Sequence, residues 1–143
     1  MSDLIARTID LGFGTTTVIT NVVGSDVQYR TFQSIAAPLE KGKGDITSGS
    51  FGASRIVKVC VDGIYYAVGE DVQSYVDNHE SRVLNNSFIK SKQYQAIFLA
   101  SLSMMTDLPI NHEVKKVIDL LAMGLPVNNM TDPPGRDSTL NRK

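Results

Sequence analysis

The chain has 143 residues, of which 42% are hydrophobic and 20% are charged, values typical of one globular domain rather than of a disordered chain. Its formal net charge of -1 gives no electrostatic reason to expect direct binding to nucleic acid, and no apolar run approaches the roughly 18 residues that a membrane span requires. The single cysteine, Cys60, excludes an internal disulfide framework. We expect a cytoplasmic protein, because the N-terminus lacks the basic and apolar regions of a signal peptide.

The first part of the chain is typical of β-strands. Residues 5–11 are mostly apolar, residues 15–23 are dense in β-branched side chains, and residues 27–32 alternate between apolar and polar side chains. Glycine-containing turns separate these runs at residues 12–14 and 24–26. We therefore expect three antiparallel strands joined by two hairpins.

The middle of the chain predicts a loop followed by another hairpin. Residues 38–54 hold four glycines among lysines and serines, which is typical of an exposed loop. Residues 56–61 and 64–68 flank Asp62-Gly63, a pair that suits a type I′ turn because both positions need a positive φ. Cys60 lies in the first of these strands, where we expect a small buried side chain.

The last part of the chain predicts a helix and then a strand. Ser91 is suited to cap the helix. Large apolar residues recur at helical spacing after it and predict a core face, namely Tyr94, Ile97, Phe98, Leu102 and Met105. We expect the helix to end at residues 107–109. Residues 117–123 are a short apolar run closed by Gly124, which predicts a buried strand that pairs in parallel with the first strand.

Candidate chemistry is concentrated in residues 10–17. Asp10 ends an apolar strand, Gly12 and Gly14 stand in the turn, and three threonines enter the next strand. The N–H groups of the two glycines can face an anion, the threonine hydroxyls add donors, and Asp10 can hold hydrated Mg2+. A plain hairpin with Asp10 as a turn residue explains the same spacing. On spacing alone it is the simpler interpretation, because short glycine motifs give many false positives.

Residues 10–16 also resemble the first phosphate motif of the actin-like ATPases, a superfamily that includes actin, large heat-shock chaperones and sugar kinases. Further segments follow in the order seen in bacterial actin-like proteins of the ParM/StbA plasmid-segregation type, namely residues 34–38, 66–71, 82–84, 94–105 and 123–127. Together they extend the resemblance over residues 5–130. The Ser-Ile-Ala-Ala-Pro and Gly-Leu-Pro-Val segments favour this type over a sugar kinase or a chaperone.

The resemblance implies an actin-like, ribonuclease-H-like α/β domain over residues 1–130, followed by a polar tail over residues 131–143. Its expected elements are three antiparallel strands, a hairpin, a helix and a further parallel strand. It implies MgATP bound between two such domains, polymerisation into filaments for plasmid segregation, and a DNA-bound adaptor protein as a partner. We expect this chain to be about half of such a protein, and therefore to hydrolyse little or no ATP alone.

The resemblance also assigns roles to individual residues. Asp10 is implied as the carboxylate that holds Mg2+ through water. The implied contacts to the ATP phosphates are Gly12, Phe13, Gly14, Thr15, Thr16 and Thr17. The family often has a lysine at the position of Thr17, which keeps a hydroxyl but carries no charge. Asn129 lies near the position of an acidic residue that orients the attacking water, and it can hydrogen-bond a water without acting as a base.

Three alternatives to a nucleotide-binding half remain open. The chain can be a non-catalytic half-actin that caps a filament or holds a partner protein, and low ATP affinity with retained binding to a full-length relative would favour it. It can be half of a sugar kinase or a chaperone, because the Asp-x-Gly turn is shared across the superfamily. It can also be an unrelated α/β domain without a nucleotide site, in which case the ordered segment matches are accidental.

Overall fold

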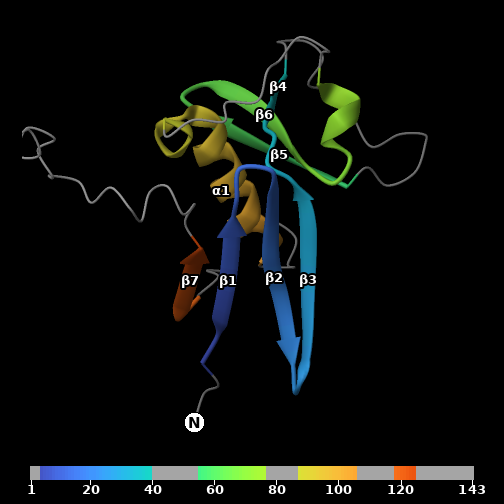
Figure 1. Ribbon diagram of the computed structural model, residues 1–143, viewed down its shortest axis with the longest axis vertical. Helices are drawn as coiled ribbons and strands as arrows, with labels where there is room; N and C mark the ends of the chain where they lie inside the picture. The colour runs from blue at the N-terminus through green and yellow to red at the C-terminus, as the bar shows by residue number, and fades with distance from the viewer. Residues whose placement is uncertain (1–3, 40–54, 77–86, 106–117, 125–143) are drawn as a thin grey trace, which may run out of the picture.

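The computed structural model describes residues 4–39, 55–76, 87–105 and 118–124, which form two β-sheets with one α-helix packed against both (Figure 1). In chain order the elements are β1 (Ala6–Leu11), β2 (Thr15–Val23), β3 (Asp26–Gln33), β4 (Ala37–Pro38), β5 (Ile56–Val61), β6 (Ile64–Gly69), the 3-10 helices η1 (Val72–Tyr75) and η2 (Phe88–Lys90), the helix α1 (Lys92–Met104) and β7 (Leu120–Gly124). The expected mixed α/β class is confirmed. None of the helices in the described part of the chain is long and apolar enough to cross a membrane.

Sheet A has the strand order β3-β2-β1-β7 and carries the segment in which candidate chemistry is concentrated. β1, β2 and β3 are antiparallel neighbours, whereas β7 pairs with β1 in parallel, as the sequence predicted. Gly24 and Ser25 connect β2 to β3, and the positive φ of 61° at Gly24 explains why a glycine stands there. A bulge between Ile19 and Asn21 then shifts the register of β2 against β3 by one residue.

Sheet B has the strand order β4-β6-β5. Its β5–β6 hairpin turns at Asp62 (φ 50°) and Gly63 (φ 80°), the positive values that a type I′ turn requires, so the predicted hairpin is confirmed. Pro38 was expected in the loop, but it pairs with β6 as part of β4, at a sheet edge where a proline is tolerated. The prediction that Cys60 is buried is wrong. Alternation along β5 places Cys60 on the same face as the exposed Lys58.

One hydrophobic core joins the two sheets through α1, which passes behind β1 and β2 in Figure 1. The face of sheet A that packs toward α1, here called the inner face, contributes Ile9, Leu11, Val18 and Phe32, and sheet B contributes Val61, Tyr66 and Val68. Ser91 caps α1 as predicted, because its Oγ accepts a 3.1 Å hydrogen bond from the N–H of Tyr94. Tyr94 and Ile97 are buried as expected. Phe98 and Leu102 are only half-buried, because the helix turns its fully buried alanines toward the sheets.

The last strand, β7, departs from the prediction in its burial and not in its pairing. Leu120 is 55% exposed and Met123 is 39% exposed, although the apolar run predicted a buried strand. Within the described residues β7 is an edge strand of sheet A, so β1 covers only one of its sides. The helix α1 ends at Met104, before the residues 107–109 at which its end was expected. Those residues and the polar tail lie outside the described residues.

Candidate functional site

Four residues from the four strands of sheet A form one cross-strand row. Asp10 of β1 pairs in register with Thr17 of β2 and with Gly124 of β7, and Thr17 pairs in turn with Thr31 of β3. The neighbours of Asp10 along β1 are buried in the core, and side chains alternate along a strand. The row therefore lies on the opposite face, here called the outer face. We call these four residues the outer row.

Asp10 is the charged member of the outer row. Its side chain is exposed, and it makes no hydrogen bond or ion pair with the residues that the structure describes. Its Oδ1 lies over β7, because a Cβ built on Gly124 would be 2.7 Å from it. This exposed carboxylate therefore has no partner within the described part of the chain and is able to meet a cation.

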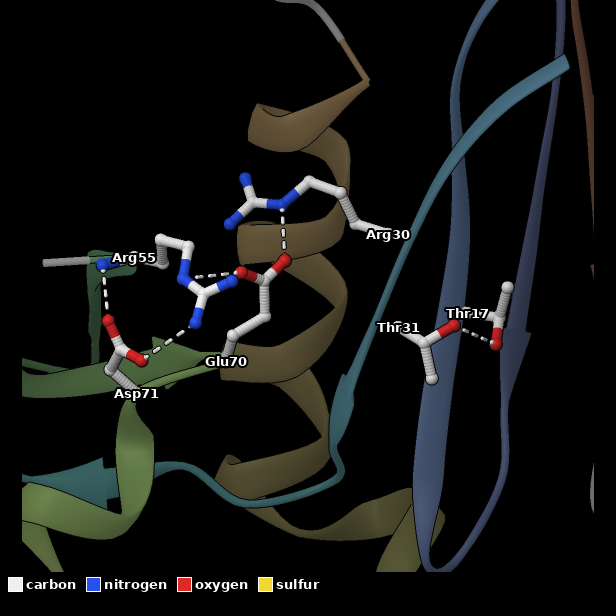
Figure 2. A network of polar contacts seen from close by, with 6 residues as sticks. All are labelled: Thr17, Arg30, Thr31, Arg55, Glu70 and Asp71. Atoms are coloured by element: carbon white, nitrogen blue, oxygen red, sulfur yellow. Dashed lines mark hydrogen bonds and ion pairs between the residues drawn. The ribbon is translucent and has the colours of Figure 1, made fainter. Parts of the chain in front are cut away.

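The three threonines that follow the turn divide between the two faces of sheet A. Thr15 is exposed, and Thr17 shares a 3.0 Å hydrogen bond with the hydroxyl of Thr31 on the outer face (Figure 2). Thr16 is fully buried on the inner face, where its Oγ1 lies 2.8 Å from the Oγ of Ser34. Two of the three hydroxyls thus share a face with Asp10, and the hydroxyl of Thr16 does not.

The turn between β1 and β2 leaves one residue, Gly14, accessible from outside. The N–H of Gly12 donates to the carbonyl of Thr15 (3.1 Å), so it is committed within the hairpin. The ring of Phe13 packs into the core against Phe88, with 5.7 Å between the ring centroids. Gly14 is exposed, and a Cβ there would have no neighbour within 4 Å. Among the described residues, no backbone carbonyl accepts from the N–H groups of Phe13 and Gly14, so an anion can approach the turn at this point.

A cluster of ion pairs lies on the other side of β3 and joins the two sheets (Figure 2). Glu70, which follows β6, accepts from the Nε of Arg30 through Oε1 and from the Nε of Arg55 through Oε2, both at 3.0 Å. Arg55 also pairs with Asp71 at 3.4 Å. Two arginines and two carboxylates balance one another here, so this cluster holds the sheets together rather than offering free positive charge to a phosphate.

The structure thus groups some of the predicted site residues and separates others. Asp10, Thr15 and Thr17 share the outer face beside the open turn at Gly14. The side chains of Phe13 and Thr16 point into the core, and Asn129 lies outside the described residues. Sequence reasoning missed two members of the outer row, Thr31 and Gly124. The rule that every second residue of a strand faces the same side could have separated the threonines in advance.

Asp10 is the carboxylate of the outer row that could meet a metal ion. No group of three or more His, Cys, Asp or Glu side chains that could hold a metal ion is present among them. Mg2+ in proteins usually keeps several waters and is bound through one or two carboxylates together with substrate phosphates. The outer row fits that manner of binding, with Asp10 as the carboxylate.

Comparisons with known proteins relate this chain to one family. The family model described as "Actin like proteins N terminal domain" matches residues 8–139. Among curated proteins, none matches this chain. A structure of the apo psk41 ParM protein is similar with a TM-score of 0.58 and 11% sequence identity, and the match covers 90% of this chain and 39% of that one. An AlfA filament bound to AMPPNP aligns with a TM-score of 0.42 and 16% identity, over 72% of this chain and 34% of that one. The chain therefore spans well under half the length of both structures.

Proposed function

Because this chain belongs to the actin-like proteins and comprises their N-terminal domain, we propose that it supplies one wall of a cleft that binds ATP with Mg2+. The observation that carries the proposal is the carboxylate of Asp10, which has no partner among the residues that the structure describes and lies in a row with Thr17 and beside the open turn at Gly14. This is also the segment that resembles the first phosphate motif of the family. We place the domain at residues 1–130 and the polar tail at residues 131–143.

Each residue of the site has a role that its position allows. Asp10 holds hydrated Mg2+ through water, and the bound cation neutralises charge on the phosphates. The N–H groups of Phe13 and Gly14 and the hydroxyls of Thr15 and Thr17 meet the phosphate oxygens. Thr17 carries no charge, so within the outer row charge neutralisation would depend on the cation. Gly12 shapes the turn, and Thr16 contributes through its backbone alone.

Activities of the complete protein go beyond this half and rest on the family. We propose that the complete protein closes the cleft with a second domain, polymerises into filaments in the cytoplasm, and segregates a plasmid through a DNA-bound adaptor. Asn129 is the proposed residue that orients the attacking water. A pocket that covers one face of a ligand loses many of the contacts that bind it. This chain alone should therefore bind MgATP weakly and hydrolyse little of it.

Calorimetric titration with MgATP tests the proposal, with magnesium-free ATP as the reference. We expect magnesium-dependent binding in the range of about 0.1–1 mM, which corresponds to roughly −4 to −5.5 kcal/mol. Asp10→Asn should abolish the magnesium dependence. Asp26→Asn is the matched control, because Asp26 is an exposed carboxylate at the far end of the same sheet. Equal affinity of the Asp10→Asn variant and the wild type would overturn the assignment.

A non-catalytic half-actin is the second candidate, and the part of the outer face that lies away from the β1–β2 turn favours it. Tyr29 is 67% exposed in this part and stands in register with Ile19, and Val22, Val27 and Leu120 are each between 45% and 55% exposed. Exposed apolar area of this kind is typical of a surface that another protein covers. Sedimentation of this chain with filaments of a full-length relative, in the absence of MgATP binding, would support this function. Binding of MgATP without co-sedimentation would exclude it.

A further inference from the structure

Gly124 stands where any other residue would meet the Asp10 side chain. A Cβ at this position would lie 2.7 Å from Oδ1, 3.4 Å from Cγ and 3.5 Å from Cα of Asp10. The first of these distances is well inside van der Waals contact, whereas the other two are close to it. The carboxylate therefore occupies the space that the missing side chain of Gly124 leaves free.

The backbone conformation does not explain why this residue is a glycine. The described glycines with positive φ are Gly24, Gly63 and Gly69, and Gly124 is not among them. Gly124 is the last residue of β7. Glycine in a strand loses more conformational freedom on folding than other residues and has no side chain to pack. A glycine in a strand often marks a bulge, a bend or a close approach by another group, and the distances to Asp10 point to a close approach here.

The pairing of β7 with β1 holds Gly124 beside Asp10. The N–H groups of Asp119 and Leu120 donate to the carbonyl of Ile5 at 2.9 and 3.2 Å. The N–H of Ile5 donates in return to the Oδ2 of Asp119 at 2.8 Å. These bonds fix the start of the parallel pairing, and a shift of one residue would turn a side chain toward the carboxylate.

We propose that Gly124 is a positioning residue that lets the carboxylate of Asp10 lie across β7 in the orientation that holds the hydrated cation. This inference rests on the proposed function for the cation itself, but the contact between the two residues stands without it. A methyl group at position 124 would displace the carboxylate rather than the backbone, because the end of an aspartate side chain moves more easily. The waters around Mg2+ lie in a near-ideal octahedral arrangement, so a displaced carboxylate would accept less well from the waters that face it.

Gly124→Ala is the test variant, and Ala122→Val is its matched control. Ala122 lies two residues earlier on β7, on the same face, and pairs with Thr8 instead of Asp10. Both variants add side-chain volume to the outer face, but only the first adds it against the carboxylate. Thermal unfolding without ligand should leave both variants folded, with Gly124→Ala as stable as the wild type or more so.

Titration with MgATP should show about tenfold weaker binding by Gly124→Ala, which is the lower end of the loss typical when an outer-shell partner of a metal is disturbed. Binding of magnesium-free ATP should be unchanged, and Ala122→Val should bind MgATP like the wild type. The double variant Gly124→Ala/Asp10→Asn should bind no more weakly than Asp10→Asn alone. Wild-type binding by Gly124→Ala, with binding lost in Asp10→Asn, would overturn this inference and leave the proposed function standing.

A second measurement needs no nucleotide. NMR couplings between the Hα and Hβ protons report the side-chain rotamer of Asp10 in the free protein. They should change in Gly124→Ala and stay unchanged in Ala122→Val. Unchanged couplings in Gly124→Ala would overturn the positioning role, whatever the titration with MgATP shows. Changed couplings without any MgATP binding would keep the contact and refute the proposed cation site.

Discussion

Replacing Thr16 with valine separates a structural role of its hydroxyl from a role in phosphate binding. Thr16 and Ser34 are 0% and 6% exposed, and their hydroxyl oxygens are 2.8 Å apart. Valine has nearly the same shape as threonine, so Thr16→Val removes the hydrogen bond without leaving a cavity. The hydroxyl of Ser34 then stays buried without this partner.

The burial of this hydroxyl pair sets the size of the expected loss of stability. A neutral hydrogen bond contributes about 1 kcal/mol, and a buried hydroxyl left unsatisfied raises the loss to about 1–3 kcal/mol. For a domain of this length, each kcal/mol corresponds to a fall in Tm of about 3 °C. Thr31→Val is the matched control, because its hydrogen bond to Thr17 is exposed. It should change the free energy of unfolding by less than about 0.5 kcal/mol.

Urea unfolding of Thr16→Val, Ser34→Ala and the double variant completes the test. Once both hydroxyls are gone, neither is left unsatisfied, so the double variant should lose at least about 0.5 kcal/mol less than the sum of the single variants. Additive losses, or a wild-type stability of Thr16→Val, would refute the reasoning. MgATP should bind Thr16→Val as it binds the wild type. Lost binding at unchanged stability would mean that this hydroxyl meets the phosphate.

The other predictions concern the contacts between the sheets and the core. Glu70→Gln should lower the free energy of unfolding in urea by about 1–2 kcal/mol, because the carboxylate is 18% exposed and accepts from two arginines. This loss should be smaller in 1 M salt, and a loss of the same size at both salt concentrations would contradict the prediction. Gly69→Ala should lower the unfolding free energy by at least about 2 kcal/mol, because φ is 145° and a Cβ would meet the carbonyl of Arg55; an unchanged Tm would refute it. Burial raises the pKa of Tyr94 above its ordinary 10.0. The unfolded chain therefore ionises first, so stability should fall as pH rises above 10. Thermal unfolding of Tyr94→Phe should show a smaller fall.

Features set by local chemistry were predictable from the sequence. The type I′ turn needs two residues that tolerate positive φ, and Asp62-Gly63 supplies them within two positions. The cap of α1 likewise needs one hydroxyl at Ser91 and the N–H three residues later. The parallel pairing of β7 was also predicted, because an apolar run after a helix commonly returns to the same sheet.

The composition of the outer row was beyond sequence reasoning. Counting outward from the turn at Gly24 and Ser25, with Val23 opposite Asp26, would place Thr31 opposite Val18. The bulge in β2 shifts the register by one, so Thr31 stands opposite Thr17 instead. A bulge depends on packing of the whole sheet and leaves no reliable signal in two short strands.

The sequence did not predict the burial of these side chains or their ion pairs correctly, for a related reason. The exposure of Cys60 depends on which face of sheet B is covered, and the exposure of β7 depends on its place at the edge of the described sheet. Arg30 and Glu70 are 40 positions apart and meet only after both sheets have formed. Such contacts follow from the tertiary arrangement and not from any local pattern.

The parallel pairing of β1 with β7 has a consequence for the order in which the protein folds. Ile5 and Asp119 are 114 positions apart, so the pairing of β7 with β1 carries the largest loop-closure cost in the described fold. In contrast, β1, β2 and β3 pair through short turns. During synthesis on the ribosome, the three-stranded meander can form early, and β1 keeps an open edge until residue 124 has emerged. Open edges are where unfinished chains pair with one another. Asp10 also lacks its neighbour Gly124 until that moment, so the outer row stays incomplete until β7 pairs with β1.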